Sequence, residues 1–215
     1  MTLGEIVMEI VVLLLVATAL WVWWQSRSRG VKSVEQHDLS MLPERFIVFD
    51  FETTGLDPTR HEIIEIGAIR VNRDSDDHET FQALVMPKGR ITKKITEITG
   101  LTRAKLVAEG MPLEQALTEF RDFVGDLPMV AYNAPFDHSF LKMACAKTES
   151  SHFKNEVCCA LAMARRAFPG RQSYRLIDLA RDGNLTLDDN HRALSDCHRA
   201  MIVYGSAARV LGTHR

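Results

Sequence analysis

A short apolar segment that ends in two acidic residues constrains this chain more than any other feature. Residues 46–51 form the segment, and Asp50 and Glu52 stand two positions apart at its end. The segment predicts a strand, and side chains two positions apart on a strand share a face. Two buried acids repel each other unless a cation offsets the repulsion, and hard divalent ions prefer oxygen ligands. We therefore predict a metal-binding strand end, followed by a turn at Thr53 to Gly55.

Strand and helix patterns alternate after this segment. Further strands are predicted at 63–71, 80–86 and 129–132, and helices at 112–124, 137–147, 160–167, 174–181 and 192–211. This order predicts an α/β fold with helices on the faces of a sheet. The length of 215 residues suits one catalytic domain with an appendage.

An apolar run at the N-terminus predicts a transmembrane helix. Glu9 is the only charge from Ile6 to Trp24. A helix of this length spans roughly 28 Å, close to the roughly 30 Å hydrocarbon core. Three tryptophans end the run, and basic residues follow it while none precedes it, which places the rest of the chain in the cytoplasm. A cleaved signal peptide and a hydrophobic helix packed on the domain remain alternatives.

These features divide the chain into three predicted parts: an anchor helix at 1–24, a linker at 25–44 and a catalytic domain at 45–215. The linker is polar and lacks periodicity. The expected protein is a single-pass membrane protein, held through residues 6–24, with a cytoplasmic catalytic domain. Four cysteines without paired spacing suit a reducing compartment.

Two later segments place further acids beside helix starts. Asn133 and Pro135 favour a helix start, which puts Asp137 in the first turn. His191 and Asp196 are five residues apart, so on one helix they would point about 140° away from each other. We therefore expect His191 at the helix entrance, leaning over a site that Asp196 faces. Taken alone, Asp137 suits the helix dipole and His191 suits an exposed structural role.

Together these residues resemble a known family. Asp50, Glu52, Asp137 and Asp196 with His191 match, in that order, the pattern of the DEDDh exonucleases. The chain is similar to DnaQ-like proofreading exonucleases, including the proofreading subunit of bacterial DNA polymerase III, over about residues 45–211. Segments 63–68, 98–102 and 164–170 take part in the match. The resemblance implies a ribonuclease-H-like mixed sheet flanked by helices, here preceded by the predicted anchor.

The resemblance also implies a reaction. The expected enzyme is a 3′–5′ exonuclease that uses two Mg²⁺ ions, with Mn²⁺ as a substitute, and releases nucleoside 5′-monophosphates. By resemblance, Asp50, Glu52 and Asp196 bind the first ion, Asp50 bridges to the second, and Asp137 reaches the second. His191 would take a proton from the attacking water near neutral pH.

The expected substrate is a nucleic acid with a free 3′ end, with single-stranded DNA favoured. Thr53, Leu56 and Phe136 are candidates for gripping the terminal nucleotide, with core packing as the alternative. The net charge of −2 means that phosphate binding needs a local basic patch. Arginines at 165–175 could supply it, or they form a solvated helix face. A polymerase is an open candidate partner.

Two positions depart from the usual family pattern and leave substrate preference open. Tyr132 and Thr99 stand where many relatives have histidine. An RNA-directed 3′–5′ exoribonuclease acting at the same site is therefore one alternative. A non-catalytic nucleic-acid-binding polymerase accessory is another, but the complete set of four acids and one histidine argues against it.

Overall fold

The structure is a computed structural model that describes residues 39–183 and 191–212. The chain divides into two compact units, Met1–His37 and Asp38–Arg215. All described residues belong to the second unit. The predicted anchor at 6–24 and most of the predicted linker therefore lie outside the described residues, and the predicted domain boundaries stay predictions. Leu42 is already buried against the core ahead of the first strand.

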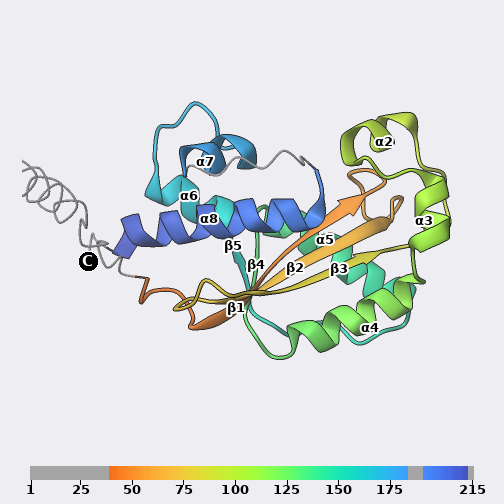
Figure 1. Ribbon diagram of the computed structural model, residues 1–215, viewed down its shortest axis with the longest axis horizontal. Coiled ribbons are helices and arrows are strands. Elements are labelled where there is room, and N and C mark those ends of the chain that lie inside the picture. Colours follow the sequence, from red (N-terminus) through yellow and green to blue (C-terminus); the bar gives the residue numbers. More distant parts are fainter. Residues whose placement is uncertain (1–38, 184–190, 213–215) are drawn as a thin grey trace, which may run out of the picture. The chain divides into compact units, whose positions relative to one another are not determined.

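Within the described residues, five strands form one sheet in the order β3-β2-β1-β4-β5 (Figure 1). The strands are β1 (Arg45–Thr53), β2 (Ile63–Asn72), β3 (Glu79–Leu84), β4 (Met129–Ala131) and β5 (Val157–Cys159). β1 pairs antiparallel with β2 and parallel with β4. The sheet is therefore mixed, and β1 is its central strand.

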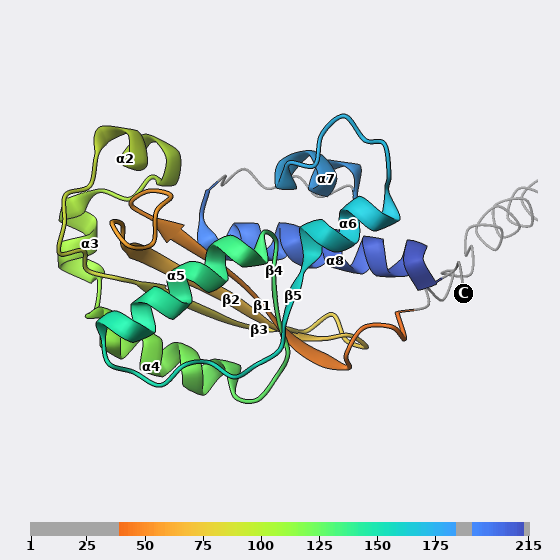
Figure 2. The same cartoon turned by 180° about the vertical axis from the view of Figure 1, so that it is seen from behind.

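Helices cover both faces of this sheet. The helices of the described residues are α2 (Lys93–Thr99), α3 (Arg103–Glu109), α4 (Leu113–Val124), α5 (Ala134–Lys147), α6 (Ala160–Ala167), α7 (Leu176–Asp182) and α8 (Ala193–Gly212), and α4, α5 and α8 contact the sheet directly. Figures 1 and 2 show α4 and α5 on one side of the sheet and α8 on the other. α6 and α7 pack against α8. The predicted α/β class, with a sheet flanked by helices, is confirmed.

Alternation along β1 explains the two cores. Ile47, Phe49 and Phe51 belong to the core on the α4 and α5 side. Phe46 and Val48 belong to the core on the α8 side. Because side chains two apart share a face, Asp50 and Glu52 continue the α8-side series at the end of the strand. The strand thus changes from apolar to acidic on one face while its other face stays buried.

The predicted elements agree with the structure, but three short ones were not predicted. These are α2, α3 and β5. Threonines begin both helices: the hydroxyl of Thr92 accepts a hydrogen bond from the Ile95 N–H, and that of Thr102 accepts one from the Lys105 N–H. α2 ends at Gly100, whose φ of 71° is readily adopted by a residue without a Cβ.

The prediction of a membrane-localised protein is wrong for the part of the chain that the structure describes. No helix among residues 39–183 and 191–212 is long and apolar enough to cross a membrane. α8, with 20 residues, has sufficient length, but it carries Asp196, Arg199 and Arg209 and packs against the sheet. Its apolar residues cover the core instead of facing lipid.

Candidate active site

The end of β1 places two carboxylates on the face covered by α8. Glu52 is buried, with 8% of its surface exposed, and Asp50 is partly buried. The antiparallel register puts Glu52 directly opposite Glu65 of β2, and the register shifts between Glu52 and Thr53. Residues opposite each other across two strands share a face. Three acids therefore lie on one face at this end of the sheet.

α5 adds a fourth carboxylate at its first turn. Pro135 lies in that turn, as its fixed φ and missing N–H allow, and Asp137 follows with only 3% of its surface exposed. The backbone N–H groups of Phe51 and Asp137 donate to the Asp137 carboxylate. Its Oδ1 atom is buried and has no hydrogen-bond partner among the described residues. A buried acceptor without a donor is costly unless a ligand satisfies it.

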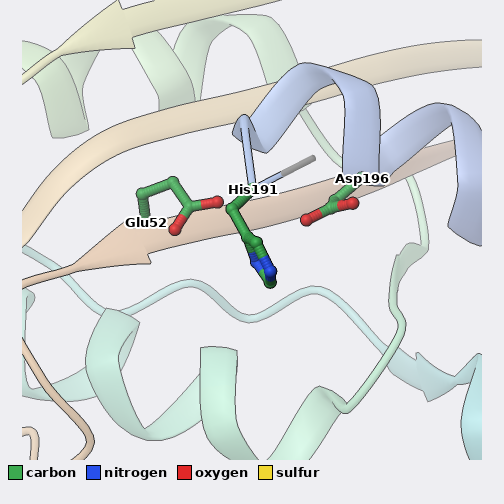
Figure 3. A group of neighbouring side chains, drawn as sticks. All are labelled: Glu52, His191 and Asp196. Atoms are coloured by element: carbon green, nitrogen blue, oxygen red, sulfur yellow. The ribbon is translucent and has the colours of Figure 1, made fainter. Parts of the chain in front are cut away.

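α8 and the residue before Arg192 complete the group. Asp196 lies in the first turn of α8, and its Oδ1 accepts a hydrogen bond of 2.6 Å from Nη1 of the buried Arg199. His191 is exposed and has a φ of 55°. One ligand atom each from Glu52, His191 and Asp196 lies within 4.8 Å of the others. Figure 3 shows the imidazole between the two carboxylates.

Burial raises the pKa of Asp50, Glu52, Asp137 and Asp196. Burial raises the pKa of Glu52 to about 8, and the charges of Asp196 and Glu65 add to it. Burial likewise raises the pKa of Asp137 to about 7, against the effect of its two N–H donors. Burial first, and then the neighbouring carboxylates, hold the pKa of Asp50 well above its usual value. The pKa of Asp196 is raised by burial, although Arg199 opposes the rise.

These residues fit a divalent cation. Ligand atoms of Glu52, His191 and Asp196 lie within 4.8 Å of one another, and Asp50 and Asp137 are not part of that close group. The charges of Asp137, Asp196 and Glu52 nevertheless act on Asp50, and the buried Asp137 Oδ1 has no partner among the described residues. A cation would satisfy that oxygen and offset the mutual repulsion. Oxygen donors are the ligands that Mg²⁺ and Mn²⁺ prefer. The imidazole of His191 is also within ligand reach of such an ion, although the sequence predicted it only as a base.

The three residues predicted to bind the terminal nucleotide differ in solvent exposure and in the contacts that their side chains already make. Leu56 is 83% exposed in the turn after β1. The hydroxyl of Thr53 donates a 2.7 Å hydrogen bond to the Gly55 carbonyl, so it shapes this turn. The ring of Phe136 is half-buried, with its centroid 5.0 Å from that of Phe140. Leu56 is therefore the side chain best placed to meet a ligand.

The arginine-rich segment adjoins Tyr132. Arg165 lies over the ring of Tyr174, at 5.9 Å from its centroid, and the Tyr132 hydroxyl donates to the Tyr174 carbonyl. Arg171 pairs with Asp182, whereas Arg165 is exposed. The other departure from the usual pattern, Thr99, is buried, and its hydroxyl donates to the carbonyl of Ile95. That hydroxyl thus stabilises the end of α2.

Three residues around the site were not singled out from the sequence. They are Glu65, Arg192 and Arg199. Glu65 is a single acid inside the apolar strand β2, and Arg192 forms an ion pair with it. An acidic residue in such a strand indicates that its buried side chain has a polar partner. The sequence does not reveal which basic side chain is that partner.

Comparisons with known proteins agree with this geometry. Residues 47–204 match the RNase_T family model, described as Exonuclease. The DNA polymerase III subunit epsilon of Aquifex aeolicus is 36% identical over 166 residues, which cover 77% of this chain and 80% of that protein. The PolC-type DNA polymerase III of Halalkalibacterium halodurans is 36% identical over 159 residues, 74% of this chain. The chain spans only 11% of that polymerase's length.

Solved structures show the same fold. Exonuclease X in complex with 5′ overhanging duplex DNA has a TM-score of 0.59 and 25% identity, covering 78% of this chain and 92% of that one. The Escherichia coli ExoI–ssDNA complex has a TM-score of 0.64 and 18% identity, covering 81% of this chain and 41% of that one. The expected fold resemblance is thereby confirmed.

Proposed function

The chain belongs to the DnaQ-like family of 3′–5′ exonucleases, and we propose that it removes nucleotides from the 3′ end of DNA as nucleoside 5′-monophosphates with two Mg²⁺ ions. One observation carries the proposal. The carboxylates of β1, α5 and α8 lie close enough for their charges to interact, and Asp137 Oδ1 lacks a partner among the described residues. Similarity to exonucleases supports the proposal that these carboxylates serve phosphodiester hydrolysis.

Asp50, Glu52, Asp196 and Asp137 would hold the ions, with Asp50 shared between them. When bound, two divalent ions stabilise the attacking and leaving oxygens of an in-line displacement at phosphorus. The raised pKa values of Glu52 and Asp137 mean that these carboxyls must give up protons as a cation enters. Cation binding should therefore strengthen as pH rises toward about 8.

His191 would act as the general base. Its imidazole is exposed and lies between Glu52 and Asp196, so it can accept a proton from a water molecule entering the site. The water oxygen then forms the new bond to phosphorus, and the bond from phosphorus to the 3′ oxygen of the preceding nucleotide breaks. That 3′ oxygen takes up a proton and leaves as a hydroxyl.

Comparison with the relatives supports DNA as the substrate of this chain. One relative is named DNA polymerase III subunit epsilon and another DNA polymerase III PolC-type, and Exonuclease X was solved with DNA. The same names support a polymerase as a partner of this chain. Leu56, exposed in the turn after β1, would support the terminal base by apolar contact, which reads no sequence.

Degradation of labelled oligonucleotides tests this function. The full-length protein is incubated with matched single-stranded DNA and RNA that carry a 5′ label and a free 3′ end. We expect a ladder shortened from the 3′ end on DNA, which requires Mg²⁺ and is lost in Asp50→Asn. A matched substrate with a 3′ phosphate serves as the blocked-end control. Faster degradation of RNA would replace DNA as the substrate, and no degradation of either would refute the proposed activity.

A further inference from the structure

Glu65 is a buried acid that the proposed reaction does not use. It lies in β2 with 0% of its surface exposed. Its oxygens accept a 2.8 Å hydrogen bond from Nη2 of Arg192 and two bonds of 3.2 Å from the Arg192 Nε. Gln82 Nε2 donates at 2.7 Å and the Ala193 backbone N–H at 3.2 Å. Both oxygens of this carboxylate thus have protein donors, whereas Asp137 Oδ1 has no partner among the described residues.

The donors to Glu65 come from the entrance of α8. Arg192 directly follows His191, and Ala193 is the first residue of the helix. His191 has a φ of 55°, which is uncommon for a residue with a Cβ and has to be held by its surroundings. The two residues after it are tied to one carboxylate, by a side chain and by a backbone N–H. The orientation of His191 is therefore fixed from the β2 side of the site.

Gly67 brings the same strand and helix into backbone contact. A Cβ at Gly67 would lie 2.5 Å from the Ala193 carbonyl carbon and from the Leu194 nitrogen. The thiol of Cys197 donates to the Gly67 carbonyl at 3.3 Å. Gly67 thus contacts the start of α8 at Ala193, Leu194 and Cys197, on either side of Asp196.

We propose that Glu65 and Arg192 form a positioning clamp that holds the His191 imidazole over the carboxylates of Glu52 and Asp196. The clamp rests on the proposed function, in which His191 is the general base. A guanidinium suits this task because it is planar and bonds a carboxylate at more than one point, which fixes direction as well as distance. Arg192 also offsets the charge of Glu65, which lies directly opposite Glu52. The clamp requires no contact of either member with the substrate.

A purely structural pair would behave differently from a positioning clamp. Loss of a structural pair lowers stability and affects catalysis equally whether or not His191 is present. Loss of a clamp that acts through His191 lowers kcat only while the imidazole is there. A double-mutant cycle separates these cases, because residues that act through each other are not additive.

The test compares Arg192→Lys in the full-length protein with and without His191→Ala. Lysine keeps the charge but loses the planar, multi-point contact. With His191 present, we expect kcat to fall by about 10-fold to 100-fold, the usual scale for a misplaced catalytic group, with KM within about twofold. In the His191→Ala background, Arg192→Lys should change the residual rate by less than about twofold. Mn²⁺ affinity without substrate, measured by calorimetry, should change little in either variant.

Arg70→Lys is the matched control. Arg70 lies on β2, the strand of Glu65, and pairs with Glu79; its side chain is 22% exposed, compared with 29% for Arg192. It should leave kcat unchanged. Glu65→Gln can replace Arg192→Lys in the double-mutant cycle with His191→Ala, because it keeps the side-chain shape while removing the charge. If Arg192→Lys does not fold, Glu65→Gln decides the result.

Three outcomes would overturn the clamp. Equal losses of kcat with and without His191 would assign the pair to structure alone, as would failure of both Arg192→Lys and Glu65→Gln to fold. If His191→Ala by itself keeps full activity, the general base of the proposed function is wrong and the clamp falls with it. The single His191→Ala variant therefore distinguishes failure of the base from failure of the clamp.

Discussion

Glu52→Gln should stabilise the protein when it is free of metal, although it removes a residue of the proposed active site. Glu52 is buried, and the charges of Asp196 and Glu65 oppose its ionisation. Its pKa is raised from 4.5 to about 8 in the folded protein. The folded state therefore holds this proton more tightly than the unfolded state does. The resulting stability is fully present below about pH 4.5 and is lost as the pH rises to about 8.

The size of the effect follows from the distance between the pH and the ordinary pKa. At pH 7, the 2.5 units above 4.5 correspond to roughly 3 kcal/mol at about 1.36 kcal/mol per unit. The gain should be smaller than this value, because the neighbouring carboxylates adjust when Glu52 is replaced and because glutamine still buries a polar group. We therefore expect a gain of about 1 to 2 kcal/mol, or about 2 to 8 °C in Tm for a protein of this size.

Thermal unfolding followed by circular dichroism in chelator measures this gain. The difference in Tm between Glu52→Gln and the unmodified protein should be largest near pH 8 and should shrink toward pH 4.5. Glu109→Gln, at the exposed end of α3, is the control and should shift Tm little. Added Mg²⁺ should stabilise the unmodified protein more than the variant. A Glu52→Gln protein that melts lower than the unmodified one in chelator at pH 8 would refute the reasoning.

Three further substitutions test other parts of the account. His191→Ala should slow hydrolysis by about 100-fold to 10,000-fold in steady-state assays while Mg²⁺ affinity by calorimetry stays nearly normal; unchanged activity would contradict the base assignment. Leu56→Ser should raise KM several-fold without lowering Tm, since the side chain is 83% exposed; an unchanged KM would remove Leu56 from the substrate site. Gly67→Ala should cost about 1 to 3 kcal/mol in urea unfolding, because its Cβ would meet backbone. Gly205→Ala, inside α8 with no described atom within 4 Å of the added Cβ, should be neutral or stabilising; equal losses at both glycines would refute the close contact.

The long elements could be predicted because their patterns are strong and local. β1 and β2 are almost continuous apolar runs, and α4 buries Ala116, Leu117, Phe120 and Val124 on one side. β5 has three residues, and α2 and α3 have seven each. Length alone is not the reason, because β4 and α7 are equally short and were predicted. The ends of α2, α3 and β5 are set by caps and by pairing with β4.

The site was partly predictable for a similar reason. Asp50 and Glu52 share a face because of strand geometry, which depends on neighbouring residues alone. The contact of Arg192 with Glu65 joins residues 127 positions apart, and only the folded sheet brings them together. Sequence spacing likewise does not reveal that Thr53 bonds its own turn or that Phe136 packs on Phe140. Local geometry thus predicts only that Asp50 and Glu52 share a face, whereas tertiary packing determines which groups surround them.

Hydrolysis in water labelled with heavy oxygen tests the central claim most directly. The full-length protein and its Asp196→Asn variant act on single-stranded DNA with a labelled 3′-terminal nucleotide, and mass spectrometry identifies the first product. We predict a nucleoside 5′-monophosphate with one heavy oxygen in its phosphate, formed in Mg²⁺ and absent with chelator or in the variant. A product released from the 5′ end, a heavy oxygen found in the sugar hydroxyl, or undiminished release with chelator would contradict the account.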